Sequence, residues 1–171
     1  AELVANSYDR SFFKNNNVGL ASVRAGNVIG GGDWGMNRLI PDLFRGLFAK
    51  TSVTVRQPEA VRPGQQVCGP IGGYLLLAAK LWTEGPDVSG AWNFGPGHEE
   101  SYKVGWIADY LCTQWGTKAG WHHTGEEYSH EAGLLKLDCS KANKELGWQP
   151  KLDIKMALDW TLDWFKAFHK H

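Results

Sequence analysis

A short apolar run, a glycine-rich loop and a helical pattern follow one another near the start of this chain. Residues 18–23 carry little charge, and a run of this length is typical of a buried strand in a parallel sheet. Residues 30–32 are three glycines, which allow close approach of a ligand or a turn with positive φ. Apolar residues then recur at helical spacing from Leu39 to Leu47. This succession predicts an open α/β fold with polar groups at the carboxyl end of its sheet, where such folds bind ligands. The alternative interpretation is an ordinary strand–loop–helix connection.

Strand and helix patterns alternate along the rest of the chain. Strands are predicted at residues 52–55, 91–94 and 134–137, and the last helix is predicted to begin near Asp153. Alternation of this kind favours an α/β fold with a largely parallel sheet. The length of 171 residues suits one domain with room for a subdomain.

The charge balance limits the kinds of partner that the sequence predicts, and the cysteines indicate the compartment. Lys and Arg number 18, as do Asp and Glu, and no basic run is present. We therefore predict neither a nucleic-acid partner nor a membrane partner. Cys68, Cys112 and Cys139 form no closely spaced pair, which indicates free thiols in a reducing compartment. The chain is predicted to be cytoplasmic.

Four ordered motifs resemble the C-terminal half of the extended short-chain dehydrogenases/reductases. They occupy residues 24–33, 37–42, 93–96 and 137–150, and read RAGNVIGGGD, NRLIPD, NFGP and LDCSKANKELGWQP. Within that superfamily the chain most resembles the nucleotide-sugar 4,6-dehydratases, and among them those of the CDP-glucose type. The resemblance implies a partial Rossmann-like parallel sheet joined to a substrate-binding subdomain. Residues 1–50 would be a remnant of the dinucleotide-binding domain, and residues 51–171 mainly the substrate-binding subdomain.

Two motifs of the complete family do not occur in this sequence. They are the Gly-x-x-Gly-x-x-Gly turn, which seats the pyrophosphate of NAD, and the Tyr-x-x-x-Lys pair that serves hydride transfer. The resemblance implies that the complete family uses NAD to oxidise carbon 4, eliminate water across carbons 5 and 6, and return the hydride to carbon 6. We predict that this chain alone binds no cofactor and supplies no catalytic residue. The first helical pattern has no N-cap, which predicts that the chain was cut from something longer. The resemblance implies that it begins just after the family's catalytic lysine, because in the family the Tyr-x-x-x-Lys helix runs directly into a segment like residues 1–4.

The resemblance assigns substrate-binding roles to six residues. Asn27 would contact a phosphate or sugar oxygen, and Arg62 and Arg38 the diphosphate. Val55 and Gln57 would lie along the base. His130 would lie near the phosphates. The full set is Asn27, Arg38, Val55, Gln57, Arg62 and His130.

Simpler interpretations of some of these residues stay open. The alternatives are that the Asn27 side chain satisfies its own turn and that Arg62 is a solvated surface arginine. His122 and His123, together with His130, raise the alternative of a metal site. No carboxylate or cysteine spacing completes such a site, so no metal is predicted.

The chain departs from the family after Arg62. Gly64 stands where the family usually has an aromatic residue, and Gly69 where it has an acid. These two departures weaken the prediction of a substrate loop at residues 64–69 more than they weaken the prediction of the fold. Two alternatives to a dehydratase portion therefore remain: a non-catalytic binding or assembly module, and a fragment of a related epimerase. The expected partners are a nucleotide-diphosphate sugar and either a second copy of the chain or a separate N-terminal half.

Overall fold

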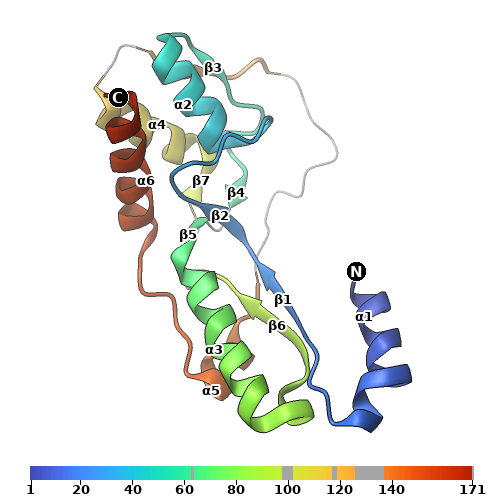
Figure 1. The fold of residues 1–171 in the computed structure, drawn as a ribbon. Coiled ribbons are helices and arrows are strands. Elements are labelled where there is room, and N and C mark those ends of the chain that lie inside the picture. Colours follow the sequence, from blue (N-terminus) through green and yellow to red (C-terminus); the bar gives the residue numbers. More distant parts are fainter. Residues whose placement is uncertain (63, 98–101, 117–118, 126–136, 171) are drawn as a thin grey trace. The chain divides into compact units, whose positions relative to one another are not determined.

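The computed structural model describes residues 1–62, 64–97, 102–116, 119–125 and 137–170 (Figure 1). The chain divides into two compact units, and each is assembled from three segments. Unit 1 comprises Ala1–Gly26, Cys68–Gly95 and Leu137–Lys151, and unit 2 comprises Asn27–Val67, Pro96–Lys136 and Leu152–His171. The units therefore interleave along the sequence. The predicted division at residue 50 assigns residues 1–50 and 51–171 to two different domains of the family fold. That assignment stays a prediction.

Unit 1 is built around one parallel strand pair. Strand β1 (Ala21–Ala25) pairs with β6 (Gly90–Phe94), with Arg24 opposite Asn93. The strand begins at Ala21, later than the apolar run at residue 18 predicts, and just before it the Leu20 N–H donates to Ser89 Oγ (3.0 Å). The other elements of unit 1 are α1 (Glu2–Tyr8), η1 (Asp9–Phe13), η2 (Lys14–Asn16), α3 (Cys68–Glu84), η3 (Gly85–Val88) and α5 (Ser140–Leu146).

The core of unit 1 lies between β6, α3 and α5. Trp92 and Phe94 of β6 are buried, and they share an apolar cluster with Leu77 and Trp148. Both indole groups also find a partner: Trp92 Nε1 donates to the Val88 carbonyl (3.1 Å) and Trp148 Nε1 to the carbonyl of Gly69 (3.2 Å). A buried indole N–H costs free energy unless it is bonded, so these contacts fix the two rings.

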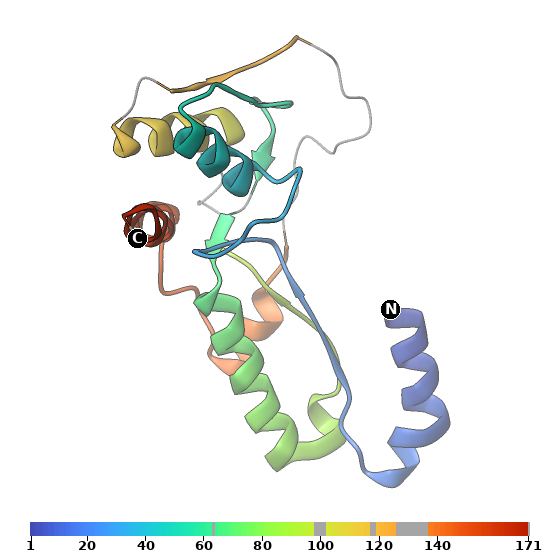
Figure 2. The same cartoon turned by 45° about the horizontal axis from the view of Figure 1, so that its top comes forward.

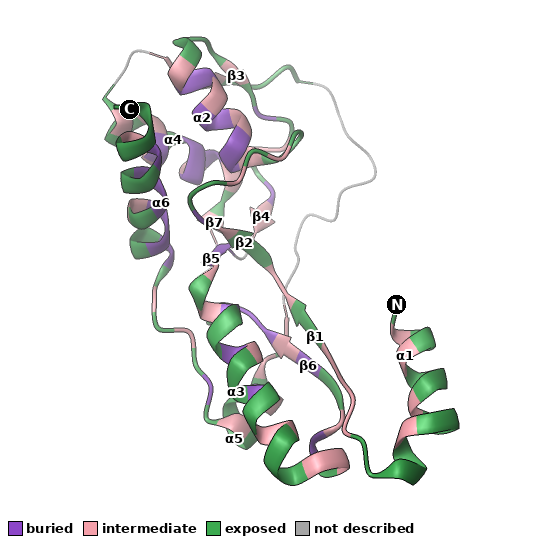
Figure 3. Cartoon of the chain, in the orientation of Figure 1, coloured by how far each residue is buried: buried purple, intermediate pink, exposed green. Residues whose placement is uncertain are grey.

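Helix α1 packs far less closely than the other helices. None of its residues is buried, and its exposed surface is visible in Figure 3. Apolar side chains of α1 and η1 face solvent within unit 1, since Val4 is 61% exposed and Phe12 57%. An ion pair between Glu2 and Arg24 links α1 to β1, and the hydrogen bond from Arg24 lowers the pKa of Glu2.

The described residues of unit 2 form three further strand pairs and three helices. Strand β2 (Asn27–Ile29) pairs in parallel with β5 (Gly64–Gln66), and β3 (Val53–Thr54) in parallel with β8 (Trp121–His122). The pair of β4 (Val61–Arg62) with β7 (Tyr102–Lys103) is antiparallel. The predicted α/β class with mainly parallel pairing is confirmed. The helices are α2 (Leu39–Ala49), α4 (Val104–Trp115) and α6 (Ile154–His169). Of the strand predicted at 134–137, residues 134–136 lie outside the described residues, and Leu137 is not in a strand.

The core of unit 2 lies among α2, α4 and α6. Figure 2 shows α6 end-on beside the other two helices. Phe44 of α2 stacks on Phe165 of α6, with ring centroids 3.9 Å apart. Between α4 and α6, the Tyr110 hydroxyl donates to Asp159 (2.7 Å), and this bond to a carboxylate raises the pKa of Tyr110 to about 12. In the described part of the chain, no helix combines the length and hydropathy needed to cross a bilayer.

Candidate functional site

Unit 2 contains a cavity of about 530 Å³, a size typical of small-molecule sites. Its wall combines polar side chains with apolar ones, and all the lining residues belong to unit 2. The polar and charged side chains are Asn27, Asp33, Asn37, Arg38, Asp42, Thr54, Arg56, Gln57 and Arg62. The apolar side chains are Val28, Ile29, Leu39, Ile40, Pro41, Val53, Val55, Ala60, Val104, Ile107 and Ile154, and the backbone of Gly30 and Gly64 completes the wall.

Two of the predicted residues, Asn27 and Arg62, line the cavity from strands β2 and β4. Asn27, the first residue of β2, lies opposite Gly64 of β5 in the parallel register. Arg62 of β4 precedes Gly64 by two positions and is half-buried, and its Nη1 donates to the Val61 carbonyl (3.2 Å). The side chain of Asn27 is exposed and makes no hydrogen bond to another described residue. The structure therefore shows no turn that this side chain satisfies within the described part.

A second group of charges lies at the N-terminal end of α2. Arg38 is the N-cap residue of α2, where a cation is unfavourable unless an anion lies nearby. Asp33 supplies that anion, with its Oδ2 3.2 Å from Arg38 Nη1. Arg56 donates to the carbonyl of Asn37 (3.3 Å), which has a positive φ of 62°. The loop that precedes α2 is thus held by charged groups that line the cavity.

The segment that follows β3 forms another part of the wall. Val55 is 2% exposed, and its N–H donates to the carbonyl of His122 on β8 (2.9 Å). Gln57 is half-buried, and its carbonyl accepts from the Ala60 N–H (3.2 Å) in a turn. The side chain of Thr54 also bonds to β8, with its Oγ1 3.2 Å from His122 Nε2. Gln57 therefore lines the cavity from the loop that follows β3, close after a segment that is paired with β8.

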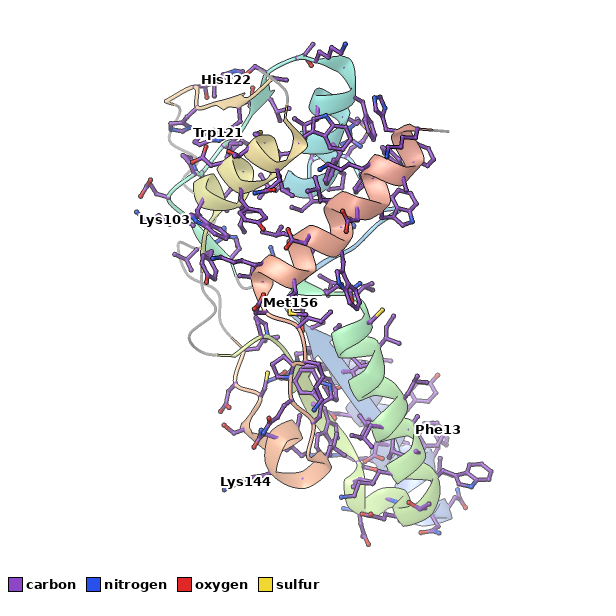
Figure 4. All side chains as sticks on the ribbon, turned by 90° about the vertical axis from the view of Figure 1, so that its left-hand side faces the viewer. Phe13, Lys103, Trp121, His122, Lys144 and Met156 are labelled. Carbon is purple, nitrogen blue, oxygen red and sulfur yellow. The ribbon has the colours of Figure 1, made fainter. Side chains whose placement is uncertain are left out.

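The histidines near this wall are engaged with hydroxyl and carbonyl groups. His122, labelled with Trp121 on β8 in Figure 4, lies between Ser52 Oγ (2.8 Å from Nδ1) and the Thr54 hydroxyl. His123 Nδ1 is 3.1 Å from the Val55 carbonyl. Among the residues that the structure describes, no three His, Cys, Asp or Glu side chains are grouped to hold a metal ion.

The structure brings five of the six predicted residues to one cavity. Asn27, Arg38, Val55, Gln57 and Arg62 all line it, and His130 lies outside the described residues. Their role in binding stays a prediction. Sequence reasoning missed Asp33 and Arg56 as cavity residues. Asp33 directly follows the triple glycine, and a charge at the end of the predicted ligand loop could have indicated a residue of the site. Nothing in the local sequence distinguishes Arg56 from a solvated arginine.

The three glycines of the loop have different surroundings. Gly30 lines the cavity, and Gly32 adopts a positive φ of 80°, as the sequence allowed. Gly31 instead packs against α6: a Cβ on this residue would lie 2.6 Å from Trp164 Cβ and closer still to the indole ring. One glycine of the motif is therefore required by helix packing and not by a ligand.

Comparison with known proteins identifies one curated relative. The chain is 49% identical to CDP-glucose 4,6-dehydratase from Salmonella typhimurium over 173 residues, which cover 98% of this chain and 48% of the dehydratase. The chain thus spans about half the length of the relative it matches. The predicted resemblance to this type of dehydratase is confirmed. No family model matches the chain.

Solved structures show the fold of the same region. The epimerase Mth375 from Methanothermobacter thermautotrophicus superposes with a TM-score of 0.83 and 19% identity, covering 99% of this chain and 48% of that one. UDP-glucuronic acid 4-epimerase from Bacillus cereus, in complex with UDP-glucuronic acid and NAD, gives a TM-score of 0.80 and 18% identity, covering 98% of this chain and 50% of that one. Over nearly all its length, the chain is similar in sequence to about half of CDP-glucose 4,6-dehydratase and has the fold of about half of these two epimerases.

Proposed function

We propose that the cavity of unit 2 binds a nucleotide-diphosphate sugar and that CDP-glucose is its ligand. The main support is the convergence of Asn27, Arg38, Val55, Gln57 and Arg62 on one cavity, although they come from separate stretches of sequence. The 49% identity to a CDP-glucose dehydratase supports the choice of sugar nucleotide.

The side chains suit the parts of such a ligand. Arg62 and Arg38 carry planar guanidinium groups, which bind phosphate oxygens with paired, charge-assisted hydrogen bonds. Asn27 offers both a donor and an acceptor to a phosphate or sugar oxygen. Val55 presents an apolar surface to a base, and the Gln57 amide can bond to a base edge. On binding, the diphosphate would form an ion pair with the guanidinium group of Arg38. In the structure, Asp33 balances the charge of that group.

We propose that the hydride chemistry is supplied from outside this chain. NAD would supply a hydride acceptor in the complete enzyme, and the two motifs that serve it do not occur in this sequence. The contribution of the present residues would be to bind and orient the nucleotide sugar in the cytoplasm. The three cysteines are free thiols, which suits a reducing compartment.

A separate N-terminal half is the proposed protein partner. Apolar residues of unit 1 are exposed on α1, η1, β1 and α3, and within the described residues β1 pairs only with β6. Exposed apolar groups beside a strand edge favour association. They include Leu3, Val4, Tyr8, Phe12, Val23, Ile71 and Leu75. A second copy of this chain is the alternative partner, and concentration-dependent dimerisation would favour it.

Replacement of Arg62 tests the proposed binding function. We expect Arg62→Ala to weaken CDP binding roughly 10- to 150-fold, because a hydrogen bond to a charged group contributes about 1.5–3 kcal/mol. Arg62→Lys should restore part of the affinity, since lysine keeps the charge but lacks the planar fork. Arg10→Ala, at an exposed position of unit 1, removes the same charge and should leave the affinity unchanged.

Ligand-observed NMR titrations with CDP, UDP and dTDP measure these affinities. Preference for CDP supports the dehydratase assignment, whereas preference for UDP supports the epimerase alternative. If the unchanged chain binds none of the three nucleotides, or if Arg62→Ala binds CDP as well as the unchanged chain does, the proposed function is wrong.

A further inference from the structure

Arg56 lines the cavity, but none of the binding roles proposed above includes it. It follows the buried Val55, and its own side chain is exposed, so a ligand that enters the cavity can reach the guanidinium group. Arg56 Nη2 donates to the carbonyl of Asn37 (3.3 Å), and the guanidinium group makes no other hydrogen bond to the described residues. A guanidinium group has five N–H donors, so four of them have no acceptor within the described part of the chain.

The carboxylates of the cavity wall are paired with other arginines. Asp33 Oδ2 lies 3.2 Å from Arg38 Nη1, and Asp42 forms an ion pair with Arg45. Among the residues that the structure describes, Arg56 forms no ion pair with a carboxylate. An anion in the cavity would therefore gain a charge-assisted hydrogen bond from Arg56 without displacing an ion pair from it.

The position of the guanidinium group indicates which part of a nucleotide sugar it would meet. The backbone of Arg56 lies between Val55 and Gln57, which have proposed roles at the base. Its guanidinium group instead reaches the carbonyl of Asn37, the residue immediately before Arg38. Arg38 has a proposed role at the diphosphate. Because the diphosphate is anionic and the base is neutral, charge and position both favour the diphosphate.

We propose that Arg56 is a further diphosphate-binding residue, which acts with Arg38 on the side of the loop that precedes α2. This inference rests on the proposed binding function and extends it to a residue outside the predicted set. On binding, a phosphate oxygen replaces the Asn37 carbonyl as the acceptor for Arg56. A hydrogen bond to a neutral acceptor is thus exchanged for one to an anion, which is shorter and stronger. Arg56 contributes to affinity for the diphosphate and not to affinity for the nucleoside.

Titrations with CDP and with cytidine, followed by NMR, separate a phosphate contact from a base contact. We expect Arg56→Gln to weaken CDP binding about five- to tenfold at low ionic strength, since solvent screens part of this exposed interaction. Cytidine has no phosphate, so its affinity should stay within about twofold. Arg56→Lys should restore part of the CDP affinity, because lysine keeps the charge but lacks the planar fork. Arg10→Gln, the same substitution at an exposed position that does not line the cavity, should leave both affinities unchanged.

Salt dependence and stability supply two further measurements. Added salt should weaken CDP binding less in Arg56→Gln than in the unchanged chain, because one screened charge is gone. Urea unfolding should show equal stability for the two proteins. A residue that only holds the loop through the Asn37 carbonyl would not alter the salt dependence.

Three results would contradict the inference and leave the proposed function intact. They are equal CDP affinity of Arg56→Gln and the unchanged chain, equal losses of CDP and cytidine affinity, and an unaltered salt dependence. If the unchanged chain binds no CDP, the proposed function is wrong and the inference fails with it. That result is visible before any variant is made.

Discussion

Gly73→Ala is expected to lower the free energy of unfolding of unit 1 by about 3 kcal/mol, at the upper end of the usual cost of overpacking a core. A Cβ at this position would lie 2.5 Å from Phe94 Cε1 and 3.0 Å from Trp148 Nε1. Both rings are buried, and Trp148 is also fixed by its bond to the Gly69 carbonyl. Neither ring can move without disturbing the core of unit 1.

Gly72→Ala is the matched control in the same helix. A Cβ on Gly72 would meet nothing within 4 Å, so this variant should gain about 0.5–1 kcal/mol from helix propensity. The same propensity gain applies at position 73, so the difference between the two variants isolates the contact with Phe94 and Trp148. Urea unfolding, with amide exchange followed in α3 and β6, measures both. Equal effects of the two substitutions would contradict the close packing of α3 on β6.

Gly31→Ala is expected to destabilise unit 2 by about 2–3 kcal/mol. The added methyl group would lie against the base of the Trp164 side chain, 2.6 Å from its Cβ, where rotation of the ring gives little relief. In a Trp164→Ala background the same substitution should cost less than about 0.5 kcal/mol, because the crowded atoms are gone. Trp164 is 40% exposed, so its own removal should leave unit 2 folded.

Gly120→Ala serves as the control for this experiment. Gly120 belongs to unit 2, and a Cβ there would meet no atom of the described residues within 4 Å. Thermal and urea unfolding of the four variants and the unchanged chain complete the cycle. A cost at Gly31 that persists without Trp164 would show that the loop needs this glycine for another reason, such as its own backbone conformation.

Local sequence signals predicted the elements better than the contacts between them. Asp153 was predicted to begin the last helix, and its Oδ1 accepts the Met156 N–H (2.8 Å) as an N-cap. The role of Gly31 was not predictable from the loop, because its contact lies on α6, far along the chain. Whether a glycine serves a turn, a helix or a ligand depends on tertiary contacts that the local sequence does not contain.

The candidate site was predictable for a different reason. Asn27, Arg38, Val55, Gln57 and Arg62 were assigned through resemblance to a family, and no periodicity in the sequence distinguishes them. The cavity depends on the pairing of β2 with β5, which are separated by more than thirty residues in the sequence. Such pairing has no local signal. The contribution of Asp33, which balances Arg38, became visible only when the loop and the first turn of α2 were placed together.

Amide shift mapping with CDP-glucose tests the central proposal most directly. The ¹⁵N-labelled chain is titrated with CDP-glucose, and glucose alone serves as the control ligand. The account predicts saturable shifts at the amides of Asn27, Gln57 and Arg62, and none at Gly73 or Ala142, which lie in the interior of unit 1. Shifts confined to unit 1, or no saturable shift at the cavity residues, would contradict the assignment of the cavity as a nucleotide-sugar site.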